Sequence, residues 1–335
     1  MQKAILIDST LRDGGYEVNF SFTPAEVATI CQKLEEAGVR FIEIGRGVAM
    51  GAGGYRKDDS NADEEYMEAA ARVLTRAKFG MFFFPSISTP EHVAIAARHG
   101  VGFIRVGTDV TNIRLSEPYI RKAKEYGMLV TANYMKSYAL GPEDLAEQVR
   151  LSEKFGADIV YLVDSAGCMF PEDIARYYAA VRKVSHIRMG FHGHDNLGFA
   201  IANSIAAAEC GFEFVDGTLQ GLGRGGGNAS IELLAAAFQK KGWSTGVDFL
   251  KLLEIGERYI KPKIIRRGRD RLDVAAGFAG FHSFFTPLVL KYAAKYAVDS
   301  AELMIEVSKK DLVNVLESDL EEIAKDMHAH HRSNI

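Results

Sequence analysis

The feature of this chain that most restricts its fold is a repeated alternation of short apolar runs with longer amphipathic segments. The apolar runs are rich in Val, Ile and Phe and too short for helices, so they predict β-strands. Strands that alternate with helices predict a parallel sheet, because parallel neighbours need long crossover connections. The eight predicted strands are Ala4–Ser9, Phe41–Gly45, Gly80–Pro85, Phe103–Gly107, Leu129–Tyr134, Ile159–Asp164, Arg188–His192 and Phe212–Thr218.

The segments between the strands carry helix start and stop signals. Thr23-Pro24 opens one helix and Gly38 closes it. The first strand runs into charged residues rather than the glycine turn of a dinucleotide-binding sheet, so a closed (β/α)₈ TIM barrel is the better prediction. We expect residues 1–245 to form this barrel and residues 246–335, where the alternation is lost, to form a helical C-terminal region.

Composition excludes several classes of protein. The net charge of −4 gives no bulk attraction to nucleic acids or acidic membranes. No apolar run approaches the roughly 20 residues needed to cross a bilayer. Cys31, Cys168 and Cys210 are widely spaced and form no disulfide framework, which favours a reducing cytoplasm. We therefore expect a cytoplasmic protein without nucleic-acid or membrane partners.

The strongest local signal is His192-Gly193-His194 at the end of the seventh strand. Residues two apart on a strand face the same side, so both imidazoles can meet one metal ion, with Gly193 leaving room between them. A second His-x-His, at His328 and His330, lies on a polar tail with no predicted strand behind it. We do not expect a preorganised site there.

A second signal, Arg12-Asp13, follows the first strand. Catalytic groups in such barrels collect at the carboxyl ends of the strands, so Asp13 is expected to lie near the two histidines. It would supply a carboxylate ligand, and Arg12 would stabilise a developing oxyanion.

A third signal is the glycine-rich run from Gly221 to Asn228, after the eighth strand. Three interpretations remain open at this point. In the first the loop holds a phosphate, in the second it turns the chain so that Asn228 caps the next helix, and in the third Asn228 reaches the metal or substrate.

Together these segments resemble the DRE-TIM metallolyase superfamily, and most of all its 4-hydroxy-2-oxovalerate (pyruvate) aldolases. The resemblance rests on Thr10–Gly14, on His192–Asn196 and on the glycine-rich loop, and it extends to Asp164–Gly167 and Gly277–Gly280. It implies a divalent-metal-dependent (class II) aldolase, which cleaves a 4-hydroxy-2-keto acid to pyruvate and an aldehyde through a metal-stabilised enolate.

The resemblance also implies roles for individual residues. Asp13, His192 and His194 would bind a divalent ion, Mn²⁺ above all, with Mg²⁺, Co²⁺ or Zn²⁺ as alternatives. Asn228 matches a position that is a metal ligand in some branches. Arg12 would steady the enolate oxygen and bind substrate, and we also expect Glu43 and Ser165 to bind substrate.

One position departs from the pattern. The aldolases have a catalytic His three residues after the metal-binding Asp, where this chain has Tyr16, and a Tyr in the C-terminal region, near His282 here. We predict that the two side chains have exchanged roles, with His282 as the base and Tyr16 as its hydrogen-bonding partner.

Other functions stay open at this stage. Lys136, near the end of the fifth strand, would serve a Schiff-base aldolase. An acyl-CoA-dependent synthase or lyase of the same superfamily and a catalytically inactive metal-binding barrel are further alternatives. The related aldolases work with an acylating aldehyde dehydrogenase docked through the C-terminal region, so that region is expected to bind such a partner or to form a homodimer.

Overall fold

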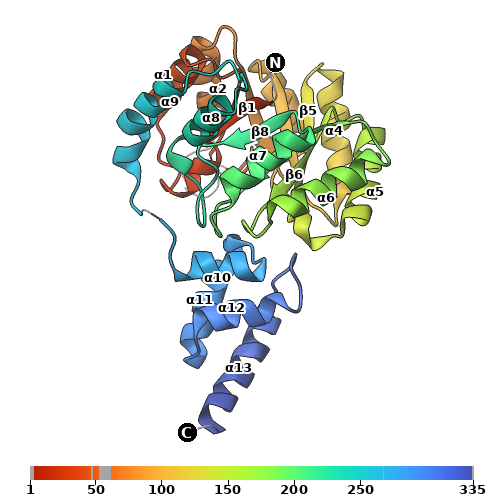
Figure 1. Ribbon diagram of the computed structural model, residues 1–335, viewed down its shortest axis with the longest axis vertical. Helices are drawn as coiled ribbons and strands as arrows, with labels where there is room; N and C mark the ends of the chain where they lie inside the picture. Colours follow the sequence, from red (N-terminus) through yellow and green to blue (C-terminus); the bar gives the residue numbers. More distant parts are fainter. Residues whose placement is uncertain (1–3, 47, 53–61, 267, 334–335) are drawn as a thin grey trace.

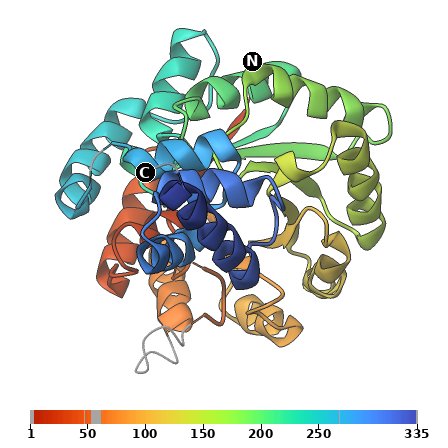
Figure 2. The same ribbon diagram turned by 90° about the horizontal axis from the view of Figure 1, so that it is seen from below.

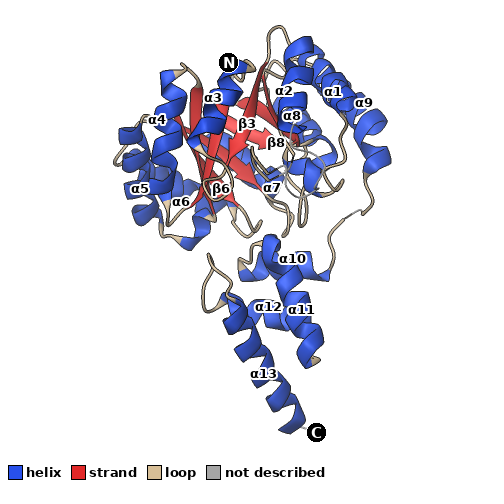
Figure 3. Ribbon diagram, turned by 180° about the vertical axis from the view of Figure 1, so that it is seen from behind, coloured by secondary structure: helices blue, strands red, loops and turns tan. Residues whose placement is uncertain are grey.

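Eight parallel strands form a closed barrel in the computed structural model, which describes residues 4–46, 48–52, 62–266 and 268–333. The strands pair in chain order, and β8 returns to β1. Figure 3 shows the strands in red, with helices around them. The predicted barrel is therefore confirmed. The strands are β1 Ile5–Leu11, β2 Phe41–Ile44, β3 Lys78–Phe83, β4 Phe103–Asp109, β5 Leu129–Met135, β6 Ile159–Asp164, β7 Arg188–Gly193 and β8 Phe214–Gly217.

A ring of helices surrounds the barrel, and its ends follow the sequence signals. Thr23 and Glu26 form a reciprocal capping box at the start of α1, with Pro24 in the first turn. Gly156 ends α5 in the left-handed conformation, at φ 102°. The helices are α1 Pro24–Glu36, α2 Ala62–Val73, α3 Pro90–Arg98, α4 Glu117–Glu125, α5 Pro142–Phe155, α6 Pro171–Arg182, α7 Ala200–Cys210 and α8 Ile231–Lys240.

The barrel interior is closed at one level by apolar side chains. Ile7, Ile159, Tyr161, Val163 and Phe214 form a cluster of their own, separate from the core between strands and helices. This cluster fills the barrel as side-chain layers do in folds of this kind.

The helices that follow residue 245 belong to two different apolar cores. Helix α9, Phe249–Ile255, contacts α1 and α8, and its Leu252 and Ile255 belong to the main barrel core. A second apolar core begins only with α10 and includes Val289 and Leu320. By packing, α9 therefore belongs with the barrel core, and the predicted division at residue 245 stays a prediction. The remaining helices are α10 Arg271–Ala279, α11 Thr286–Tyr296, α12 Ser300–Ser308 and α13 Glu317–Ser333.

The helices α10 to α13 lie over one end of the barrel (Figures 1 and 2). Two contacts that join them to it are a hydrogen bond from Lys136 Nζ to the Val313 carbonyl, 2.6 Å, and one from Asn196 Nδ2 to the Asp273 carbonyl, 3.0 Å. The expectation of a polar tail at His328 and His330 was wrong, since both lie within α13. Among the described helices, none combines the length and apolar character needed to cross a membrane.

Candidate metal centre and its cavity

The end of β1 places Arg12 and Asp13 at the mouth of the barrel. The pairing of β1 with β2 shifts register between Asp8 and Leu11, and the chain then turns into a short 3₁₀ helix, Asp13–Tyr16. Arg12 Nη1 donates to Asp13 Oδ1 at 2.6 Å, and both side chains are almost fully buried. A rigid strand end and an adjacent ion pair thus fix the position of the carboxylate.

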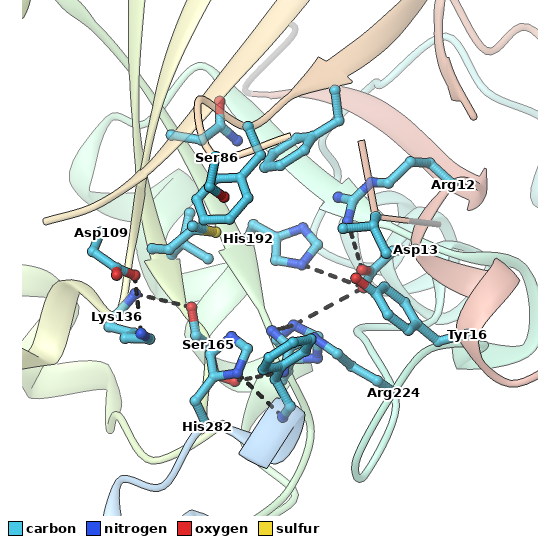
Figure 4. Close-up of a pocket in the computed structure, with 18 of the residues that line it drawn as sticks. Arg12, Asp13, Tyr16, Ser86, Asp109, Lys136, Ser165, His192, Arg224 and His282 are labelled. Atoms are coloured by element: carbon cyan, nitrogen blue, oxygen red, sulfur yellow. Dashed lines mark hydrogen bonds and ion pairs between the residues drawn. The ribbon is translucent and has the colours of Figure 1, made fainter. Parts of the chain in front are cut away.

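The end of β7 brings the two predicted imidazoles to the same carboxylate. His192 Nε2 lies 3.7 Å and His194 Nε2 3.9 Å from Asp13 Oδ2 (Figure 4). One ligand atom from each of the three residues lies within 4.8 Å of the others. Residues far apart in the sequence therefore converge, as predicted. Gly193 also leaves room for the Phe191 ring, which a Cβ at this position would meet at 2.8 Å.

The chemistry of this group fits a divalent cation. Burial would raise the pKa of Asp13, but the nearby Arg12, followed by His194 and His192, outweighs it and holds the pKa well below its usual range. Burial, and then Arg224, holds the pKa of His194 well below its ordinary value, so this imidazole is neutral. An ionised carboxylate beside a neutral imidazole is the protonation state that metal binding requires. His194 Nδ1 is also buried without a partner in the described part of the chain.

A layer of buried charges lies behind the group Asp13, His192 and His194 and holds His192 and the neighbouring Arg12. His192 Nδ1 lies 2.8 Å from Asp216 Oδ2 on β8. Arg105 on β4 bridges that carboxylate to Glu43, and Glu43 Oε2 accepts from Arg12 Nη2 at 3.1 Å. Carboxylate–histidine contacts of this kind orient metal ligands. The layer therefore positions His192 on one side and Arg12 on the other.

Glu43 was expected to bind substrate, and the structure places it elsewhere. It is fully buried, and the cavity lining identified among the described residues does not include it. Its carboxylate instead holds Arg12 and Arg105. We now interpret Glu43 as a positioning residue.

Asn228 lies against the metal group through its amide nitrogen. Asn228 Nδ2 donates to Asp13 Oδ2 at 2.6 Å and to the Leu222 carbonyl at 3.1 Å. In this orientation Asn228 is a hydrogen-bonding partner of Asp13, and its role as a metal ligand stays a prediction. The helix-cap interpretation was wrong, because Ser230 Oγ accepts from Leu233 N at the start of α8.

The glycine-rich loop permits this close approach. A Cβ at Gly223 would lie 2.4 Å from Asn228 Nδ2, and one at Gly226 would lie 2.7 Å from the backbone of Asn196. The loop also carries Arg224, to which sequence reasoning gave no role. Arg224 donates to Ser283 Oγ at 2.8 Å, and its Nη2 lies 3.1 Å from His194 Nε2.

A cavity of about 440 Å³ opens in front of the metal group. Much of its wall is apolar, with Phe82, Phe84, Met135 and Val163 among the lining residues. The predicted site residues that line it are Arg12, Asp13, Tyr16, Ser165, His192, His194 and His282. The barrel and the C-terminal region thus contribute to one chamber.

His282 comes from the loop between α10 and the turn Ser283–Phe285. Burial, followed by the charges of Arg224 and Lys136, holds its pKa well below the ordinary value, so the ring is neutral. The backbone N–H of Phe284 donates to His282 Nδ1 at 3.3 Å, which is long for a hydrogen bond. Tyr16 lines the same cavity from the 3₁₀ helix after β1, with its ring edge-on to Phe20.

Lys136 also lines the cavity, but as a paired ammonium. Its Nζ lies 3.0 Å from Asp109 Oδ1 and donates to the Val313 carbonyl. Its backbone N–H donates to Ser165 Oγ at 2.9 Å. An ammonium held in this way is a poor nucleophile, so the geometry disfavours the Schiff-base alternative.

Comparisons with known proteins identify similar chains along nearly the whole length. A family model described as HMGL-like matches residues 3–258. A 4-hydroxy-2-oxovalerate aldolase from Carboxydothermus hydrogenoformans is 38% identical over 97% of this chain and 98% of its own length. One from Pelotomaculum thermopropionicum is 37% identical over 96% of this chain and 95% of its own.

Among solved structures, the N-terminal domain of a candidate aldolase from Bacteroides vulgatus superposes with a TM-score of 0.74 at 27% identity. The match covers 87% of this chain and 98% of that one.

Proposed function

The chain belongs to the HMGL-like family, and from this premise we propose that it is a divalent-metal-dependent aldolase. It is a carbon–carbon lyase that cleaves a 4-hydroxy-2-keto acid to pyruvate and an aldehyde. The observation that carries the proposal is the convergence of Asp13, His192 and His194 on one wall of a cavity, with the Arg12 guanidinium beside them.

Asp13, His192 and His194 would hold the metal ion. One carboxylate with two imidazoles suits a first-row divalent ion, and we propose Mn²⁺, with Mg²⁺, Co²⁺ or Zn²⁺ as alternatives. When bound, the ion supplies Lewis acidity toward the carboxylate and keto oxygens of a 2-keto acid.

Arg12 would stabilise the negative charge that develops as the C3–C4 bond breaks. The electron pair of that bond passes to C3, which gives the enolate of pyruvate. Arg12 lines the cavity, and its guanidinium is held in advance by Asp13 and Glu43. A donor fixed before the reaction needs no reorganisation when the charge appears.

The proton of the 4-hydroxyl group would pass to His282 as the aldehyde forms. A neutral imidazole can accept a proton near physiological pH, and the environment of His282 keeps its ring neutral. Acceptance at Nε2 requires that the ring's own proton lies on Nδ1, and the long bond from the Phe284 N–H to Nδ1 is then lost, which costs little because the bond is weak. Tyr16 would orient the substrate by a hydrogen bond.

The C-terminal region would close the reaction chamber against water. Phe284, Phe285 and Asn314 line the cavity together with His282. An apolar cover strengthens the interaction between charged groups inside the chamber and protects the enolate from premature protonation. In this proposal Ser165, which also lines the chamber, binds the substrate.

The outer face of the same region would bind a protein partner. Phe278 is 72% exposed, and Val274 and Leu290 are also exposed. We propose an acylating aldehyde dehydrogenase or a second copy of this chain as the partner. We place the enzyme in the cytoplasm, since its cysteines are free and unpaired thiols persist in reducing compartments.

The proposal is tested by measuring pyruvate release from 4-hydroxy-2-oxovalerate by the purified protein. We expect turnover that a chelator abolishes and that added Mn²⁺ restores. Full activity in chelator, with borohydride trapping of substrate on Lys136, would contradict the metal-dependent assignment and favour a Schiff base.

A further inference from the structure

An ion pair forms the end of the cavity opposite Arg12 and Asp13. Lys136 and Asp109 lie across the chamber from Arg12, Asp13 and Tyr16 (Figure 4). Asp109 is the last residue of β4, and Lys136 directly follows β5. Lys136 is only 5% exposed, so the pair is largely removed from bulk water.

The backbone of Lys136 points to a requirement for this side chain. It has a left-handed conformation, φ 57° and ψ 40°, which costs a residue with a Cβ about 1–2 kcal/mol and costs glycine nothing. The backbone N–H is fixed by Ser165 Oγ, so the conformation is held in place by the barrel. A lysine at a position that would suit glycine indicates that the ammonium itself is needed.

A buried ion pair is seldom kept for stability. Desolvation of the two charges offsets most of their attraction, and apolar residues of similar volume are often equally stable. Phe82, Phe84 and Met135 show that apolar residues are accepted elsewhere in this cavity wall. The pair therefore indicates that this end of the cavity binds a polar group of a ligand.

The two charges together select the kind of group. The polar contacts of Lys136 Nζ, to Asp109 and to Val313, account for two of its three N–H bonds, and the Phe285 ring centroid lies 5.5 Å away. An anionic group would meet repulsion from Asp109, and an alkyl group would leave the desolvated pair without hydrogen bonds. A hydroxyl group suits both partners, because it can accept from the ammonium and donate to the carboxylate.

We infer that the aldehyde fragment of the substrate carries a hydroxyl group that binds between Lys136 and Asp109. This inference rests on the proposed function, which places the keto-acid end of the substrate at Asp13, His192 and His194. The natural substrate would then be a 4-hydroxy-2-keto acid with at least one further hydroxyl group beyond C4. The cavity of about 440 Å³ has room for such a ligand, since binding cavities for ligands of drug size begin at about 300 Å³.

The test uses the reverse reaction, in which pyruvate loses a proton from C3, C3 bonds to the aldehyde carbon and the aldehyde oxygen gains a proton. Pyruvate and Mn²⁺ are supplied with paired aldehydes that differ by a terminal hydroxyl in place of a methyl group. The pairs are glycolaldehyde with propanal, and 3-hydroxypropanal with butanal. We expect kcat/KM to favour the hydroxyl member of at least one pair by about 10-fold or more, because a site built for a hydroxyl rejects the analogue without it.

Two variants test whether Lys136 and Asp109 cause this preference. In Lys136→Met and in Asp109→Asn, we expect the ratio of the two kcat/KM values to fall toward one. Asp109→Asn leaves the contact of Lys136 with Val313 in place, so it separates substrate binding from attachment of the C-terminal region. Lys122→Met, at an exposed lysine paired with Glu125, is the matched control and should keep the wild-type ratio.

The outcomes separate the two hypotheses. Equal use of both members of each pair by the wild-type enzyme would overturn this inference and leave the proposed function intact. An unchanged ratio in both variants would assign the pair a structural role only and also overturn the inference. No condensation with any aldehyde, with Mn²⁺ bound, would overturn the proposed function and this inference with it.

Discussion

The two walls of the cavity are built from different kinds of structure. Asp13, His192 and His194 stand at the ends of β1 and β7, two strands that pair with a neighbour on each side. The facing wall takes His282 and Asn314 from loops between C-terminal helices. The strand ends can hold a metal ion at fixed positions, whereas the loops, which carry the proposed base His282, can adapt to the substrate.

Substitutions in the strand wall, formed by Asp13, His192 and His194, should cause the largest loss of activity. We expect His192→Ala to abolish metal binding and to lower turnover by on the order of 10³-fold or more, because Lewis-acid stabilisation is worth several kcal/mol and about 1.4 kcal/mol is tenfold. Bound Mn²⁺ and pyruvate release are measured together. His330→Ala, on exposed α13, is the control. If His192→Ala keeps its metal and its turnover, the proposed metal-binding role of this wall is wrong.

Substitution of His282 in the loop wall, which His282 and Asn314 help to form, should cause the next largest loss of turnover, without loss of metal. We expect His282→Ala to lower kcat by about 10²–10⁴-fold, as removal of a general base does. Tyr16→Phe should have a much smaller effect, and Mn²⁺ affinity should stay unchanged in both variants. The opposite ranking of the two variants would refute the proposed exchange of roles between His282 and Tyr16.

A substitution of Asp216 in the buried charge layer should weaken metal binding at the strand wall and leave the loop wall unaffected. In Asp216→Asn, His192 loses its carboxylate partner, and we expect Mn²⁺ affinity to fall about 10–100-fold. Excess Mn²⁺ should restore most of the turnover. Glu213→Gln, at a surface pair with Arg188, is the matched control. Unaltered affinity in Asp216→Asn would show that β7 positions His192 without help.

The smallest effect is expected where the two walls are joined. Asn196→Ala removes the hydrogen bond to the Asp273 carbonyl, which should lower the free energy of unfolding by about 1 kcal/mol. Turnover should fall a few-fold, since the bond helps to hold the region that carries His282. Mn²⁺ affinity, measured by titration, should not change. A loss of affinity equal to that of Asp216→Asn would mean that the walls are not independent.

The same difference between the walls explains what the sequence could predict. The side chains of a strand alternate, so a His-x-His at the end of a predicted strand already places both rings on one side. The carboxyl ends of parallel strands meet at one face of a barrel, which brings Asp13 to them. Local periodicity and one topological rule were therefore sufficient for the metal-binding group.

The loop wall and the charge layer depend on contacts that leave no local pattern. Glu43 was expected at the substrate, but it lies one layer deeper, where it holds Arg12 and Arg105. A charged residue between Ile104 and Val106 in the middle of a strand was the available signal for this layer. The pairing of Lys136 with Asp109 joins two strand ends and a C-terminal carbonyl, and spacing along the chain cannot predict it.

The central claim is that three side chains from distant parts of the chain hold one cation. The most direct test is a crystal structure of the protein soaked with Mn²⁺ and pyruvate, with anomalous scattering used to locate the metal. We expect one strong anomalous peak within bonding distance of Asp13, His192 and His194, with pyruvate beside Arg12. A peak elsewhere, or no peak while the crystals retain pyruvate, would contradict it.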